Sequence, residues 1–129
     1  MDDFFYRKLK VYHLSKQMVA NIYALSRNFP KQEFYGIANQ LQRAAVSVPS
    51  NIAEGMGRFS DKERLHFLDI AIGSLHEAMC QLEIVELIGY ISKEQLNVQE
   101  ECIREISKML VGLRNTIDSK IKNNKGIKE

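Results

Sequence analysis

The sequence predicts an all-α protein folded as an antiparallel, up-down-up-down four-helix bundle. Apolar residues recur at every third or fourth position over four long segments, which is the spacing of one buried helix face. The 129 residues include only two prolines and seven glycines, too few turn signals for the many short strands of a sandwich or barrel. The segments follow one another closely, and short connections favour antiparallel neighbours.

The first helix is expected from Leu9 to Asn28, where it ends at Phe29 and Pro30. A second periodic run extends from Phe34 to Ile52, but Pro49 interrupts it. Because proline removes a helical hydrogen bond and crowds the preceding turn, we expect either one helix kinked at Pro49 or two short helices that meet at Val48.

The third and fourth helices each begin with a capping box, in which a hydroxyl and a side-chain carbonyl or carboxylate satisfy free backbone amides. Ser60 with Glu63 starts the third helix, and Ser92 with Gln95 starts the fourth. The third helix carries apolar residues beyond a single face, so we expect it to have a second buried surface. Periodicity is lost after Lys120, so residues 1–121 are predicted to form the bundle and residues 122–129 a flexible basic tail.

Charge is distributed unevenly although the net charge is only +2. Residues 1–60 carry +4, residues 61–109 carry −5, and residues 110–129 carry +3. Basic ends around an acidic middle fit either a polyanionic partner or head-to-tail pairing of copies. No uncharged apolar run is long enough to cross a membrane, and no secretory signal is present, so a cytoplasmic protein is expected.

No set of residues predicts catalysis, a metal or a cofactor. Di-iron bundles need two Glu-x-x-His pairs, and Glu63 with His66 is the single such pair in this chain. Cys80 and Cys102 lie within helices without an activating setting, although folding of the last hairpin would place them level, where they could touch. We therefore expect a non-enzymatic protein.

Polar and small residues interrupt the apolar pattern between Gln40 and Arg58. A fold about Arg58 and Phe59 would place Ala44 and Ala45 opposite Ser74 and Gly73, so that small residues face each other. The same register predicts an ion pair between Arg43 and Glu77, with Glu54 as the competing partner. The alternative is that these polar groups meet a ligand or a neighbouring subunit; the groups concerned are Arg43, Ser47, Asn51 and Arg58.

The amino-terminal segment mixes aromatic rings with basic side chains, a combination in which rings stack on bases and cations contact phosphates. Such aromatics can also pack as a lid on the bundle or on an adjacent subunit. The candidate nucleic-acid-binding residues are Arg7, Lys8, Lys10, Lys16 and Arg58.

Two motifs resemble the four-helix-bundle family named for open reading frames within intervening sequences of bacterial 23S ribosomal RNA genes. The first motif falls on Gln40, Arg43, Ala44, Ser47, Pro49, Asn51, Glu54 and Gly55. The second falls on Gly73, Ser74, Leu75, Glu77, Gln81 and Leu82.

The resemblance implies a bundle that assembles into a ring, a homopentamer, similar to the accessory proteins of diversity-generating retroelements. Those relatives use a basic surface for nucleic acid and for a reverse-transcriptase partner. We therefore expect a homo-oligomer that binds RNA, a ribonucleoprotein or a nucleic-acid-processing protein. The alternative is a protein-interaction scaffold without a nucleic-acid role, in which the same basic residues meet the acidic 61–109 region of neighbouring copies.

Overall fold

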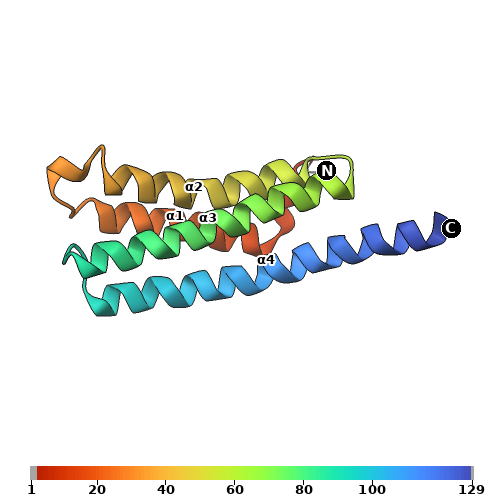
Figure 1. Ribbon diagram of the computed structural model, residues 1–129. Helices are drawn as coiled ribbons and strands as arrows, with labels where there is room; N and C mark the ends of the chain where they lie inside the picture. Colours follow the sequence, from red (N-terminus) through yellow and green to blue (C-terminus); the bar gives the residue numbers. More distant parts are fainter. Residues whose placement is uncertain (1–2, 129) are drawn as a thin grey trace.

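A computed structural model describes residues 3–128 of the chain, with side chains as far as residue 124, and contains no strand in that range. The prediction of an all-α four-helix bundle is confirmed, and consecutive helices run in opposite directions in Figure 1. In chain order the elements are η1 (Phe5–Lys8), α1 (Lys10–Ser26), η2 (Lys31–Glu33), α2 (Ile37–Met56), α3 (Asp61–Leu87) and α4 (Lys93–Lys128).

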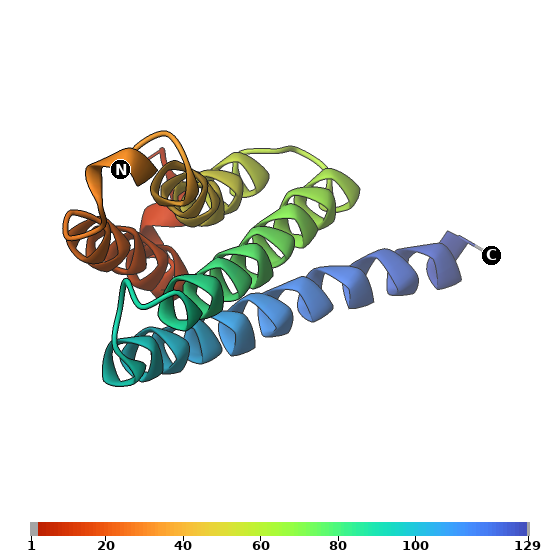
Figure 2. The same cartoon turned by 60° about the vertical axis from the view of Figure 1, so that its left-hand side comes forward.

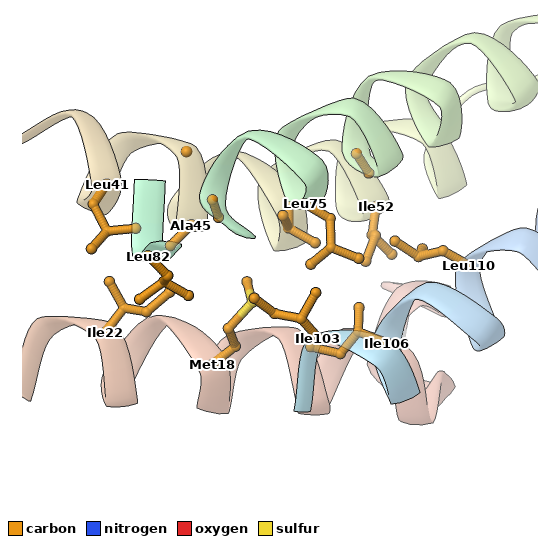
Figure 3. Packing of buried hydrophobic residues seen from close by; sticks show 14 of the residues in the cluster. Met18, Ile22, Leu41, Ala45, Ile52, Leu75, Leu82, Ile103, Ile106 and Leu110 are labelled. Atoms are coloured by element: carbon orange, nitrogen blue, oxygen red, sulfur yellow. The ribbon is translucent and has the colours of Figure 1, made fainter. Parts of the chain in front are cut away.

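The core lies along the middle of the bundle and receives one apolar stripe from each helix (Figure 3). Burial of each large aliphatic side chain stabilises the fold by about 1.5–3 kcal/mol, so these stripes hold the helices together. The residues labelled in Figure 3 are Met18 and Ile22 from α1, Leu41, Ala45 and Ile52 from α2, Leu75 and Leu82 from α3, and Ile103, Ile106 and Leu110 from α4.

The helix α2 runs without interruption through Pro49, which is buried. The alternative of two short helices meeting at Val48 is therefore wrong, whereas the kink at Pro49 stays a prediction. The helix also begins later than the apolar pattern does. Phe34 lies before its start, and 68% of that residue is exposed.

The pair α2 and α3 packs closely where Gly55 meets the start of α3. A Cβ atom at Gly55 would lie 2.9 Å from Cβ of Phe67 and 3.4 Å from the carbonyl oxygen of Arg64. Such distances leave no room for a methyl group, so glycine is required by the close approach of the two helices.

The register of α2 and α3 differs by about one helical turn from the predicted one. Ser74 lies opposite Ser47 rather than Ala44, with the two hydroxyl oxygens 2.8 Å apart. Gly73 is exposed and faces open space, so the small residue at the closest approach is Gly55. Phe67 packing over Gly55 sets this offset, which counting residues about the turn does not reveal.

At the far end of the bundle, η2 is tied to the connection between α3 and α4. The hydroxyl of Tyr90 donates to Glu33 Oε2 at 2.6 Å, and the ring of Tyr90 lies 5.5 Å from that of Phe29. The hydrogen bond to Glu33, followed by burial and by the carboxylate charge, raises the pKa of Tyr90. Gly89, which follows the end of α3 and precedes Tyr90, adopts a positive φ of 87° that glycine takes without strain.

The helix α4 continues past the core. Ile121 is its last side chain that packs against the core, yet residues 122–128, predicted as part of a flexible basic tail over 122–129, are helical as far as Lys128. Residue 129 lies outside the described residues. Figure 2 shows these last turns extending beyond the other helices.

Replacement of Gly55 by alanine tests the close approach of α2 and α3. We expect Gly55→Ala to lower the free energy of unfolding by about 1–3 kcal/mol, because the added methyl group must displace Phe67 or the helix backbone. Gly73→Ala is the matched control: its methyl group enters open space within a helix, so it should raise stability by about 0.5–1 kcal/mol. Urea denaturation measures both, and equal effects of the two substitutions would contradict the packing described here.

Candidate nucleic-acid interface

The amino-terminal segment forms one side of the interface. The short helix η1 carries Arg7 and Lys8 and packs beside α1 and α2. An edge-on contact between the rings of Tyr6 and Tyr12, with centroids 4.8 Å apart, fixes η1 to α1. His13 Nε2 lies 2.6 Å from the carbonyl oxygen of Arg7 and adds a polar link. The basic side chains of η1 are thus presented on a fixed backbone.

The cations of this segment are exposed and differ in their contacts. The guanidinium of Arg7 lies over the ring of Phe4, 4.4 Å from its centroid, and Lys16 Nζ lies 4.9 Å from the centroid of Tyr12. Lys8 and Lys10 form no ion pair with any residue in the described part of the chain. No internal carboxylate therefore competes with an external anion for these two lysines.

Arg58 reaches the same surface from the connection that follows α2. Its guanidinium pairs with Glu54 and lies 4.8 Å from the centroid of the Phe67 ring, with 40% of the side chain exposed. Arg58 lines a groove together with Phe4 and Tyr6. The fold thus brings the predicted residue Arg58 next to the amino-terminal segment although some fifty positions separate them in sequence.

Lys10 and Lys16 lie farther along α1 and do not line this groove. Because each helical residue turns by about 100°, the six positions between them place the two side chains about 120° apart around the helix. The five predicted cations therefore form a loose basic surface rather than a single row.

Both basic ends of the sequence lie at one end of the bundle. Figure 1 places the start of the chain, the connection between α2 and α3, and the last turns of α4 at the same end. Lys120 and Lys122 are exposed on those last turns, and Lys122 pairs with Asp118 at 3.2 Å. An uneven charge distribution along the sequence thus becomes a basic end of the molecule.

The polar stretch of α2 has a structural role at two of its positions, Ser47 and Asn51. Besides its contact with Ser74, the Ser47 hydroxyl accepts a hydrogen bond from Asn51 Nδ2 at 2.9 Å, and the same amide donates to the Ser47 carbonyl at 2.7 Å. These half-buried groups link α2 to α3 and satisfy one another. The contact between Ser47 and Ser74 joins α2 to α3, whereas Asn51 holds the Ser47 hydroxyl from within α2.

The predicted ion pair between Arg43 and Glu77 is wrong. Both side chains are exposed and line a groove between α2 and α3, yet no ion pair within 4.0 Å joins them in the described part of the chain. Glu77 instead accepts a hydrogen bond from Gln81 at 3.3 Å, and the competing partner Glu54 is paired with Arg58. An exposed pair gains little free energy from ordering two long side chains, so the two charges need not pair even where both line one groove.

The remaining candidate groups for chemistry are the histidines, cysteines and carboxylates. Residues 3–128 contain no group of three such side chains that could hold a metal ion. Cys80 is exposed, whereas burial and the charge of Glu105 raise the pKa of the half-buried Cys102 thiol and so disfavour its thiolate. No helix in the described range is long and apolar enough to cross a bilayer.

Sequence reasoning missed Phe59 as a surface residue. It lies in the connection between α2 and α3, beside Arg58, and 98% of it is exposed. In the sequence, Phe59 marks only the turn between the second and third predicted helices. Its position between Gly57 and the helix-capping Ser60 is the signal that could have marked an aromatic ring outside any buried stripe.

Comparison with known proteins identifies the family of this chain. The family model described as 23S rRNA-intervening sequence protein matches residues 7–112, most of the chain. The chain belongs to that family. A comparison with curated proteins gives no match.

A solved structure from Bacteroides thetaiotaomicron VPI-5482 shares the fold. Its title describes a protein with unknown function from the S23 ribosomal protein family. It matches with a TM-score of 0.73 and 25% sequence identity, covering 81% of this chain and 97% of that chain. The family resemblance of the two motifs is thereby confirmed, and neither description names a reaction.

Substitution of Arg43 separates the structural from the ligand-binding interpretation of the motif. Because Arg43 is exposed and forms no ion pair with the described residues, Arg43→Ala should change the free energy of unfolding by no more than about 0.5 kcal/mol. Ser47→Ala, which removes the hydroxyl that meets Ser74 and Asn51, should lower it by about 0.5–1.5 kcal/mol. Thermal unfolding measures both, and a larger loss for Arg43→Ala would restore the predicted ion pair.

Proposed function

We propose that the protein is a non-enzymatic, homo-oligomeric bundle of the cytoplasm that binds RNA through its basic end. One observation carries the proposal: Lys8 and Lys10, exposed and without an ion pair to any described residue, share one end of the bundle with Arg7, Arg58 and the end of α4. Cations without competing carboxylates attract phosphates, and binding releases counterions from the nucleic acid. A binding role fits the described residues, among which no group of side chains could hold a metal ion.

Assembly into a ring of copies would make a loose basic surface effective. Each copy offers few phosphate contacts, but linked copies bind with an avidity far above that of one alone. Exposed large apolar side chains on α3 and in the connections at its far end and before α2 support self-association, because burial between copies would remove them from water. These residues are Phe34, Tyr35, Ile70, Ile84, Leu87 and Ile88. A homopentamer is the assembly that the family resemblance favours.

Charge reversal of Lys8 and Lys10 tests RNA binding. Lys8→Glu combined with Lys10→Glu should abolish binding of a fluorescently labelled structured RNA at about 50 mM salt, because two phosphate contacts per copy become repulsions. Fluorescence anisotropy over a range of salt concentrations provides the measurement. For the native protein, the logarithm of the affinity should fall linearly with the logarithm of salt.

The same variant distinguishes the protein scaffold from the RNA-binding protein. Loss of RNA binding with the oligomer intact is the expected result. Dissociation of the oligomer would instead show that these lysines meet acidic surfaces of neighbouring copies. No RNA binding by the native protein at about 50 mM salt would leave a protein–protein scaffold as the function.

Light scattering coupled to size exclusion tests assembly. We expect a mass near five times that of the 14.9 kDa chain. Leu87→Lys, at a residue that is 81% exposed, should lower the mass without unfolding the chain, because a charge would have to be buried between copies. A native mass of 14.9 kDa would refute the oligomer.

A further inference from the structure

Phe59 is the most exposed large apolar residue in the described part of the chain, at 98%. It stacks on no other ring and meets no cation among those residues. The fold therefore gains almost nothing from this ring, because stabilisation by an apolar side chain comes from burial. A phenylalanine ring presented to solvent in this way is available to a flat partner.

The ring stands at one side of a groove at the basic end. Phe4 and Tyr6 of the amino-terminal segment line the groove together with Arg58 and Phe59, and Ser50, Ala53 and Gly57 of the α2 region also line it. Phe4 and Phe5 are about half exposed, at 50% and 54%. Aromatic rings from two distant parts of the sequence thus surround one hollow.

Cations flank these rings. Arg58 precedes Phe59 directly, and Lys62 follows it within the first turn of α3. Lys62 is exposed and has no ion pair with the described residues. Aromatic rings on which bases can stack, with cations beside them to contact phosphates, are the elements of sites that bind single-stranded nucleic acid without demanding a particular sequence.

We propose that the RNA bound at the basic end is single-stranded, with an unpaired base stacked on Phe59 and the adjacent phosphates on Arg58 and Lys62. This inference rests on the proposed function and specifies its ligand. In a duplex the faces of the bases are covered by their neighbours, so an aromatic ring reaches a base only where the strand is unstacked.

The carboxylates of the groove favour the same ligand. Glu54 and Glu63 line it beside Arg58 and Phe59. A duplex presents mainly phosphates and 2′-hydroxyls, and the phosphates would be repelled by these carboxylates, whereas the amino groups of an unpaired base can donate to them. The groove is thus better suited to a base than to a row of phosphates.

Phe59→Leu tests the stacking contact. The ligand is a labelled single-stranded RNA of about 15 nucleotides, compared with the same strand annealed to its complement, and anisotropy is recorded at about 50–200 mM salt. We expect the single strand to bind the native protein more tightly than the duplex does. Phe59→Leu should weaken single-strand binding about tenfold and leave duplex binding unchanged.

Two controls make the result specific. Tyr23→Leu replaces a partly exposed aromatic residue near the carboxyl end of α1, outside the groove, and should leave both affinities unchanged. Lys62→Ala should reduce the slope of log affinity against log salt, whereas Phe59→Leu should lower the affinity at every salt concentration with the slope unchanged. Since the Phe59 ring is exposed, melting temperatures of native protein and Phe59→Leu should agree.

The outcomes separate the stacking inference from the proposed RNA binding. Equal binding of duplex and single strand, or no effect of Phe59→Leu, would overturn this inference and leave the proposed RNA binding in place. Failure of the native protein to bind either RNA would overturn the proposed function, and this inference with it.

Discussion

The close approach of α2 and α3 at Gly55 is the constraint on which the arrangement of the molecule depends. With no side chain on Gly55, Phe67 can pack against the helix backbone, and the two helices come close enough for Ser47 and Ser74 to share a hydrogen bond. The connection that joins them must then turn sharply, and it holds Arg58 and Phe59 at the surface. The amino-terminal segment packs beside the same end of α2. The glycine at position 55 thus allows the helix packing that places Arg58 and Phe59 near the amino-terminal segment.

The alternation of helix direction explains how a nearly neutral chain has a basic end. Because the four helices alternate in direction, the amino-terminal segment and the last turns of α4 lie at the same end of the bundle (Figure 1). The negative segment, residues 61–109, comprises α3, the α3–α4 connection and roughly the first half of α4. The net charge of +2 therefore does not show how charge is distributed, because the topology brings residues from both ends of the sequence to one end of the bundle.

Much of the fold was predictable from sequence, because helices and their buried faces depend on local periodicity. The capping boxes at Ser60 and Ser92 are present as predicted, with Glu63 N donating to Ser60 Oγ and Gln95 N donating to Ser92 Oγ. The register of α2 against α3 was not predictable, because it depends on how Phe67 packs over Gly55, a contact between distant segments. The candidate site likewise combines features that local sequence predicts with features that depend on the tertiary fold. The basic amino-terminal segment was visible as a sequence pattern, whereas its meeting with Arg58, and the exposure of Phe59, required the tertiary fold.

The positions of the two chain ends have a practical consequence for anyone who handles this protein. A purification tag or fluorescent fusion joined at either terminus would sit beside the basic end, where it could shield the surface electrostatically or sterically. The tight bend around Gly89, on the opposite side of the molecule, is a better place for an inserted label or surface anchor. Immobilised through that bend, the molecule would turn its basic end toward the solution.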